Sequence, residues 1–433
     1  MESYSSDTLA SAGVMVAAMY FVKLIVMLTT SASPPRSQYP KLGKDLRRTE
    51  FDHLDQNTVF CNCGAWGCVP KKLIIRQMEV IKLRERNPHW YTAVIARPLY
   101  KESMVAISQM VGANPENLTL IENTTTGTNT VLKLQKYSPG DKILLVNLHT
   151  YPAVMKQVKN VVKNNPGVEM VCIDIPFPIK CKDDILTPYA KALKEHPEIK
   201  ITVVDHITSS TAILMPIKEI IDLCHQHNVI VMIDGAHAPG QLYLSIEEYG
   251  ADFYVGNLSK WMMTPRGIGF LWVHPKHQAS MSPLVTSHAE NSENFIDRFY
   301  SQMTKDMIPH VLVKDAVNFF KDLGGLDNIS RRNSSIVTEA SKMLSEAWNT
   351  PQLEVKQQFR APFMALVGFP IALNTVYEAD DVGFAKELSI DLLKKGTDVK
   401  CIFFEGRFWC RISCNVWNDR EDYEKVATTE RKK

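Results

Sequence analysis

An α/β fold with two domains is predicted by three features of this 433-residue sequence. Seven short apolar runs alternate with helix-like segments between residues 118 and 274. These runs are continuously apolar, which is typical of strands buried on both faces of a parallel sheet. After about residue 309 the alternation stops, and long helical stretches with isolated strands follow. We therefore expect a large domain with a mostly parallel seven-stranded sheet and a smaller α+β C-terminal domain.

The elements follow in order along the chain. Before the alternation we expect a helix and turn over residues 44–55, a strand over 58–61, a glycine-rich loop over 62–70 and helices over 71–86 and 101–111. The strands of the large sheet are expected at 118–122, 142–147, 169–173, 199–205, 229–234, 253–257 and 269–274. Helices are expected between them at 127–134, 153–162, 188–195 and 217–227. The small domain has predicted helices at 310–323 and 334–348, and strands of a mixed sheet at 363–368 and 408–412.

The same features divide the chain into four segments. We expect an apolar segment and linker over 1–39, a segment over 40–75 at the edge of the functional site, a large domain over 76–308 and a small domain over 309–433. Residues 9–28 are apolar enough to span a bilayer, although Lys23 interrupts them. A membrane anchor, a weak signal segment and a loosely ordered extension are all consistent with this stretch.

Polar residues of complementary type follow several predicted strands. Lys260 lies just beyond the strand at 253–257, and is either a solvent-facing loop residue or a cleft lysine with a lowered pKa. Asp234 ends another buried strand 26 residues earlier, as a cap or as the partner of a cation. Residues 123–127 (NTTTG) open a helix, either as a plain N-cap or as a phosphate site.

Together these three features predict a pyridoxal phosphate site. The cofactor needs a lysine that forms a Schiff base, an aspartate that holds the proton of the pyridine nitrogen, and a turn that binds phosphate. Lys260, Asp234 and the threonine turn supply these groups. His237, three residues after Asp234, could point at the phenolate oxygen of the ring, although a lone histidine is more often a packed residue.

Six motifs carry a resemblance to a known family: NCGAWGCVP, ENTTTGTNTVL, PGDKILL, VIVMIDGAHAPGQ, GNLSKWMMTPRGIGFLWV and WCRISCNVWN. As a set they resemble class-V aminotransferases of the fold-type I pyridoxal-phosphate superfamily. Within that family they look most like the branch of isopenicillin N epimerase-like enzymes and hercynylcysteine sulfoxide lyases. The resemblance covers residues 43–426 and implies the fold-type I architecture, pyridoxal 5'-phosphate and chemistry at Cα or Cβ of an amino-acid substrate.

The resemblance also implies roles for single residues. Lys260 would be the Schiff-base lysine and the general base and acid at Cα. Asp234 would pair with the pyridine nitrogen, His237 would lie near the ring O3′, and Tyr151 would stack on the ring. The phosphate contacts would come from three further residues, Thr124, Thr125 and Asn257.

The substrate side and the dimer follow in the same way. Arg411 would grip the substrate α-carboxylate, a task that suits its bidentate fork. Asn62 belongs to the loop that borders the substrate. Thr304 matches a stretch that reaches the phosphate of the neighbouring subunit, which implies a homodimer with shared sites.

Four positions depart from the family pattern. Ser259 stands where a histidine usually precedes the lysine, and Cys63 replaces the histidine of the Asn-His-Gly loop. Met303 and Lys305 replace the glycine and arginine around Thr304. Because the loop with Cys63 is expected to face the substrate, that change leaves the substrate open.

Several reactions remain possible for such a site. Epimerisation, C–S lysis and transamination share removal of the Cα proton, and the sequence does not choose among them. A cysteine desulfurase would need a mobile nucleophilic cysteine, whereas Cys401 lies in an apolar strand-like context typical of packing. An inactive, cofactor-binding interaction protein is a further alternative, which the presence of Lys260, Asp234 and Arg411 disfavours.

The charge and the cysteine content of the sequence limit which partners the protein can bind and in which cellular compartment we expect it. The net charge is +2, from 49 basic and 47 acidic residues, which gives no nucleic-acid surface. The nine cysteines are scattered, and the cluster of Cys61, Cys63 and Cys68 lacks a second half, so we expect no metal site. Glycosylation sequons at Asn123 and Asn257 fall in the predicted cofactor pocket. Because glycans there would block the pocket, we expect a cytoplasmic enzyme, and a membrane tether over residues 9–28 is one alternative.

Overall fold

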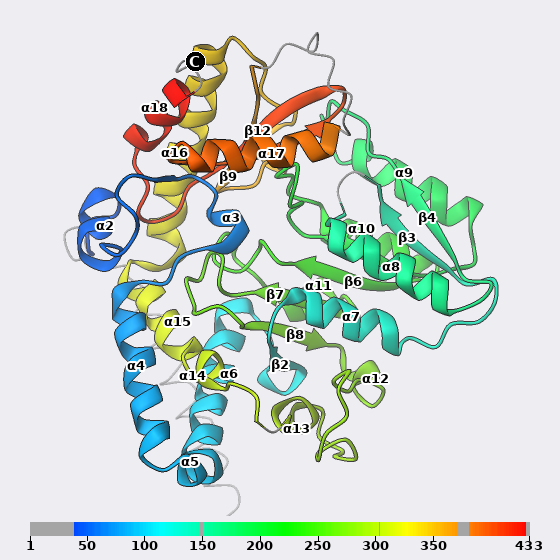
Figure 1. Cartoon of the computed structure of the whole chain (residues 1–433). Helices are drawn as coiled ribbons and strands as arrows, with labels where there is room; N and C mark the ends of the chain where they lie inside the picture. Colours follow the sequence, from blue (N-terminus) through cyan, green and yellow to red (C-terminus); the bar gives the residue numbers. More distant parts are fainter. Residues whose placement is uncertain (1–38, 148–149, 303, 371–380, 430–433) are drawn as a thin grey trace, which may run out of the picture. The chain divides into compact units, whose positions relative to one another are not determined.

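The computed structural model describes residues 39–147, 150–302, 304–370 and 381–429 (Figure 1). Lys41–Lys433 form one compact unit, separate from the residues before it. The predicted apolar segment over residues 9–28 lies outside the described residues. Within the described ranges, no helix is both long and apolar enough to cross a membrane. The predicted boundaries at residues 75 and 308 remain predictions.

A seven-stranded sheet forms the centre of this unit, as the sequence predicts. Its strands are β2 (Leu118–Ile121), β3 (Lys142–Val146), β4 (Glu169–Ile173), β5 (Ile199–Asp205), β6 (Ile230–Gly235), β7 (Phe253–Asn257) and β8 (Gly269–Val273). They lie in the order β2-β8-β7-β6-β5-β3-β4. Only β8 runs antiparallel to its neighbours β2 and β7, and the other neighbouring pairs are parallel. The prediction of a mostly parallel sheet is confirmed.

Helices cover both faces of this sheet. The connecting helices are α7 (Thr124–Leu134), α8 (Pro152–Asn164), α9 (Asp183–Glu195) and α10 (Ile217–Gln226). Within β6, Met232 packs in one buried cluster with Val131 of α7, whereas Val231 and Ile233 pack in the other with Ile220 of α10. Successive strand residues thus enter opposite cores, which explains why the strands are continuously apolar.

The smaller sheet differs from its prediction. It consists of β9 (Met364–Gly368), β11 (Lys400–Phe404) and β12 (Arg407–Ser413) in the order β11-β12-β9, and both pairings are antiparallel. The expected mixed sheet is therefore wrong. The parallel pairing in this region is a separate two-stranded ladder between β1 (Val59–Phe60) and β10 (Thr397–Asp398).

The remaining helices have the following bounds. Those before β2 are α2 (Lys44–Glu50), α3 (Cys63–Trp66), α4 (Lys71–Arg86), α5 (Pro88–Trp90), the π-helix η2 (Tyr91–Ile95), α6 (Ala96–Val111) and the 3₁₀ turn η3 (Pro115–Asn117). Those after β6 are α11 (Ile246–Tyr249), α12 (Pro275–Gln278), α13 (Phe295–Tyr300), α14 (Ile308–Val311), α15 (Val313–Asp322), α16 (Gly325–Trp348), the 3₁₀ turn η4 (Gln357–Phe359), α17 (Asp381–Lys394) and α18 (Arg420–Thr429). The predicted helix at 310–323 is thus α14 and α15, and α16 begins nine residues before its predicted start at 334.

The loop after α3 contacts the chain just beyond β7. Gly67 has φ 65° and ψ 179°, a conformation that glycine alone adopts readily. A Cβ on Gly67 would lie 2.0 Å from the Ser259 carbonyl oxygen and 2.7 Å from that of Lys260. The absence of a side chain at Gly67 therefore lets this loop close over the backbone of Lys260.

We expect Gly67→Ala to lower the free energy of unfolding by about 2–4 kcal/mol, since strain and overlap act together. Gly250→Ala is the matched control, because Gly250 has φ 72° but no atom within 4 Å of its added Cβ. The control should cost about 1 kcal/mol. Urea unfolding of both variants measures the difference, and equal losses would show that the contact with Lys260 is not tight.

Candidate active site

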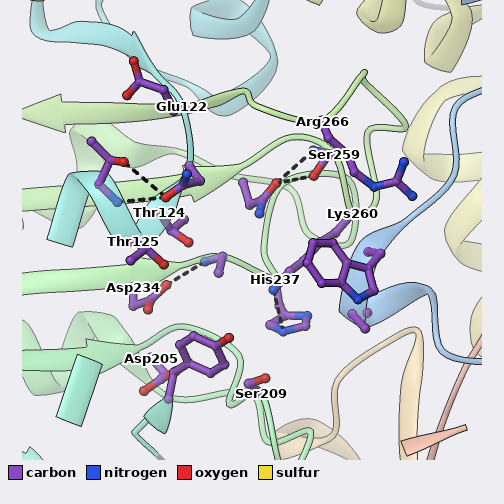
Figure 2. Close-up of a pocket in the computed structure, with 18 of the residues that line it drawn as sticks. Glu122, Thr124, Thr125, Asp205, Ser209, Asp234, His237, Ser259, Lys260 and Arg266 are labelled. Atoms are coloured by element: carbon purple, nitrogen blue, oxygen red, sulfur yellow. Dashed lines mark hydrogen bonds between the residues drawn. The ribbon is translucent and has the colours of Figure 1, made fainter. Parts of the chain in front are cut away.

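A cavity of about 630 Å³ lies at the carboxyl ends of the parallel strands. Residues at the ends of β5, β6 and β7, the start of α7, the α3 loop and β12 line it. Figure 2 shows Thr124, Thr125, Asp234, His237 and Lys260 gathered around this space. The site forms where parallel α/β sheets usually bind ligands, because strand ends and helix starts meet there.

Lys260 and His237 form the centre of the cavity. The Lys260 Nζ lies 3.0 Å from the His237 Nε2. Burial and the nearby cations hold the pKa of His237 well below its usual range, so the imidazole is neutral. Burial also lowers the pKa of Lys260 from 10.5 to about 8, although Asp234 pulls it upward. Lys260 is therefore an amine that can lose its proton near neutral pH.

Asp234 lies at the end of β6 and is buried. Among the described residues, one hydrogen bond reaches its side chain, from the Ala236 N–H to Oδ1 at 3.0 Å. Asp205 pairs with Asp234 in the register of β5 and β6 and lines the same cavity. Burial raises the pKa of both carboxyls, and the charge of Asp234 adds to the rise at Asp205. The site thus holds two adjacent carboxyl groups that have no bonded cation among the residues the structure describes.

The start of α7 lines a further part of the cavity. Asn123 caps the helix by accepting a hydrogen bond from the Thr126 N–H at 2.9 Å. The amides of Thr124 and Thr125 precede the first intrahelical bond, so they are available to an anion. The Asn257 side chain accepts hydrogen bonds from both the N–H and the hydroxyl of Ser259, each at 2.9 Å. Ser259 thereby fixes Asn257 beside the cavity.

Arg411 approaches from the small sheet. It is buried, its Nη2 donates to the Asn62 Oδ1 at 2.9 Å, and its Nη1 donates to the Ser209 carbonyl. The Nε is buried and has no partner among the described residues. Burial lowers the pKa of Arg411 to about 10, which leaves it charged at neutral pH. Asn62 in turn donates to Asp398 at 3.1 Å. Asn62 and Arg411, the two residues predicted to bind the substrate, are therefore held in place by hydrogen bonds.

Three other predicted positions lie differently. Tyr151 lines the cavity and is 40% exposed. Thr304 is exposed and does not line the cavity of its own chain, although its neighbour Lys305 pairs with Glu122 at the cavity edge, 2.7 Å apart. Cys63 does not face the substrate space: it is buried, with Sγ 3.3 Å from the Ser413 hydroxyl. Gly64, Ala65 and Trp66 of that loop line the cavity in its place.

Sequence reasoning missed four charged residues that line the cavity, namely Glu122, Asp205, Arg266 and Lys400. Asp205 follows the buried strand β5 as Asp234 follows β6, so the same signal was present in the sequence. Lys400 begins β11 and lines the cavity beside Arg411. No local pattern marks Lys400, because its position depends on pairing between β11 and β12.

The site fits pyridoxal phosphate on its own geometry. The buried Asp234 has no hydrogen-bonded cation within the described part of the chain, and a protonated ring nitrogen would supply one. The α7 start offers amides and hydroxyls to a phosphate, and Lys260 offers an amine that lines the same cavity. Each part of the cofactor therefore has a matching group in the cavity.

The lowered pKa of Lys260 can be measured without the cofactor. We expect trinitrobenzenesulfonate to label Lys260 of the cofactor-free protein with a midpoint near pH 8, because only the neutral amine reacts. The rate rises as pH increases through that value, and an ordinary lysine would show its midpoint near 10.5. Mass spectrometry of the peptide that contains Lys260 separates it from other lysines. A midpoint near 10.5 for that peptide would contradict the buried environment.

Known proteins resemble this chain over most of its length. Residues 88–426 match the family model of the class-V aminotransferases. A putative L-cysteine desulfhydrase of Oryza sativa is 27% identical over 92% of this chain and 90% of its own. Hercynylcysteine sulfoxide lyase of Schizosaccharomyces pombe is 22% identical over 86% of this chain and 94% of its own.

A solved structure has the same fold. It is the complex between the cystine C–S lyase C-DES and its product cysteine persulfide, with a TM-score of 0.69 and 18% identity over 88% of this chain and 98% of that chain. The family model matches well over half of the sequence. The chain therefore belongs to the class-V aminotransferase family and is a pyridoxal-phosphate-dependent enzyme with the fold-type I architecture.

Proposed function

We propose that this enzyme is a C–S lyase for L-cysteine or an S-substituted L-cysteine. The reaction breaks the Cβ–S bond and, with one water, yields pyruvate, ammonia and the free thiol or sulfide. The observation that carries this proposal is the agreement of two relatives over nearly the whole chain, whose names both denote cleavage at a cysteine sulfur. Pyridoxal phosphate supplies, when bound, an electron sink for the pair released at Cα.

The substrate is oriented by Arg411. Its guanidinium is held by Asn62 and the Ser209 carbonyl, and its buried Nε has hydrogen-bonding capacity left. A carboxylate bound there forms charge-assisted hydrogen bonds with a group that is already in place. This contact fixes which bond at Cα faces Lys260.

Lys260 moves the proton at Cα. An amine with a pKa near 8 takes a proton as a base and returns it as an acid at neutral pH. The neutral His237, whose Nε2 lies 3.0 Å from the Lys260 Nζ, holds the amine in position through a hydrogen bond. The departing sulfur leaves as the Cα–H electron pair moves toward Cβ, so lysis consumes no further oxidant or reductant.

The remaining predicted residues would hold the cofactor. Asp234 would pair with the ring nitrogen, while Thr124, Thr125 and Asn257 would bind the phosphate. Tyr151 would cover the ring. Thr304, exposed on its own chain, would reach the phosphate of a second subunit in a homodimer. The compartment of the enzyme, including any tether over residues 9–28, also remains a prediction.

A cysteine desulfurase is less well supported by the same cavity. That reaction needs a nucleophilic thiolate close to the substrate sulfur. None of the described residues that line the cavity is a cysteine. Burial raises the pKa of Cys63 well above its usual range, so this neighbouring thiol stays protonated. Cys401 is buried on β11 and lines a separate cavity.

The test is product analysis with the cofactor-loaded enzyme. Incubation should release equal amounts of pyruvate and ammonia, together with sulfide from L-cysteine, cysteine persulfide from cystine and the free thiol from S-alkyl cysteines. Alanine with persulfide would identify a desulfurase, D-amino acid an epimerase, and a keto acid that keeps its sulfur a transaminase. Any of these three outcomes, without pyruvate, would overturn the lyase proposal.

A further inference from the structure

Two cationic side chains lie side by side on neighbouring strands of the small sheet. Lys400 of β11 lies directly opposite Arg411 of β12 in their antiparallel register. Residues opposite each other in such a pair project to the same face, and like charges there are destabilising. Both side chains line the active-site cavity. The proposed carboxylate site at Arg411 accounts for one of these charges and leaves Lys400 without a role.

Lys400 has no acidic partner within the part of the chain that the structure describes. Burial, together with the charges of Arg411 and Lys260, lowers its pKa from 10.5 to about 7. No carboxylate opposes that shift. Asp398, two residues earlier, accepts a hydrogen bond from Asn62 instead. A half-buried amine surrounded by cations is costly unless a bound group compensates it.

Lys400 also stands between two cavities. A second cavity of about 720 Å³ lies beside the first, between α17, β11 and the start of α8. The two cavities share two lining residues, Lys400 and the exposed Trp66. The second cavity is lined largely by apolar side chains, among them Met155, Ile390 and Phe403. A group that extends from the active site into this space passes Lys400.

We propose that Lys400 determines specificity by binding a negative charge on the group attached to the substrate sulfur. The substrates would then be S-conjugates of cysteine with two acidic groups, one bound by Arg411 and the second by Lys400. The identity of the substrate as a cysteine conjugate rests on the proposed lyase function. An anion between the two cations also offsets their mutual repulsion and thereby favours the charged form of Lys400.

Binding can test this separately from turnover. The probes are 3-(carboxymethylthio)propanoate and 3-(carbamoylmethylthio)propanoate, which lack the amine and differ only in the distal charge. Calorimetry with the cofactor-loaded enzyme should show at least about tenfold tighter binding of the acid at pH 6.5. Lys400→Met should bring the ratio close to one, whereas Lys400→Arg should keep it. Lys342→Met is the control, because Lys342 is exposed on α16 and lines neither cavity.

Turnover provides the second measurement. The ratio of kcat/KM for S-carboxymethyl-L-cysteine to that for S-carbamoylmethyl-L-cysteine should fall about tenfold in Lys400→Met and stay within twofold in Lys400→Arg. A wild-type binding ratio near one, or a ratio that Lys400→Met leaves unchanged, would overturn the assignment even if cysteine is cleaved. Normal binding with lost turnover in Lys400→Arg would overturn it in favour of proton transfer. If no lysis occurs, the binding ratio still decides the role of Lys400.

Discussion

Replacing Lys260 by alanine is expected to reduce pyruvate release by at least about 10⁴-fold. The substitution removes the amine that moves the Cα proton, and no described side chain offers an equivalent group at that position. The neighbouring His237 is buried and neutral, and its Nε2 already faces Lys260. Lys260→Arg should be as inactive, because guanidinium does not lose its proton near neutral pH.

Two further measurements make this result specific to Lys260. Borohydride reduction of the cofactor-loaded wild-type enzyme should attach the cofactor to the peptide that contains Lys260, and Lys260→Ala should lose this label. Lys342→Ala, a change at an exposed lysine of α16 that lines neither cavity, should keep both label and activity. A label that persists in Lys260→Ala would contradict the central assignment of the site.

Arg411→Ala is expected to lower kcat/KM about a thousandfold, mainly through KM. The loss has two parts. The variant lacks the carboxylate contact, and it leaves the Asn62 Oδ1 and the Ser209 carbonyl without the guanidinium that donates to them in the wild-type enzyme. Arg411→Lys should recover only part of it, because an ammonium does not reproduce the planar fork. Steady-state kinetics with L-cysteine measures the effect.

Cysteinamide provides the matched comparison for Arg411. It lacks the carboxylate, so the wild-type enzyme should use it poorly, and Arg411→Ala should lower its kcat/KM far less than that of L-cysteine. If both substrates lose activity equally, Arg411 supports the structure of the loop with Asn62 and does not bind the carboxylate.

The pattern of apolar residues predicted most strands of the large sheet. A strand that is buried on both faces has apolar residues at successive positions, and such a run can be recognised in the sequence. The run at Val229–Ile233, followed by Asp234, shows this clearly, and the helix predicted at 71–86 has the same bounds as α4. The reversed direction of β8 has no such signal. It depends on which neighbours the strand pairs with, and apolar composition is the same in either direction.

The candidate site divides in the same way. Residues that end strands or begin helices, such as Asp234 and Thr124, could be found because position and chemistry coincide in the sequence. Lys400 could not be found in this way, because only the strand register that places it opposite Arg411 brings it to the cavity. The inward turn of Cys63 toward Ser413 likewise depends on contacts between residues 350 positions apart.

The bonds of the α3 loop to β12 have a consequence for the newly made chain. Asn62 bonds to Arg411, 349 residues later, and the Ser413 N–H donates to the Cys61 carbonyl at 2.7 Å. At ordinary synthesis rates the Asn62 loop leaves the ribosome roughly 20–70 s before its partners exist. During that interval the central sheet and the cofactor end of the site can form, while the part that holds substrate is missing. A chain released before β12 would therefore retain Lys260 and Asp234 but lack the arginine that positions an amino acid beside them.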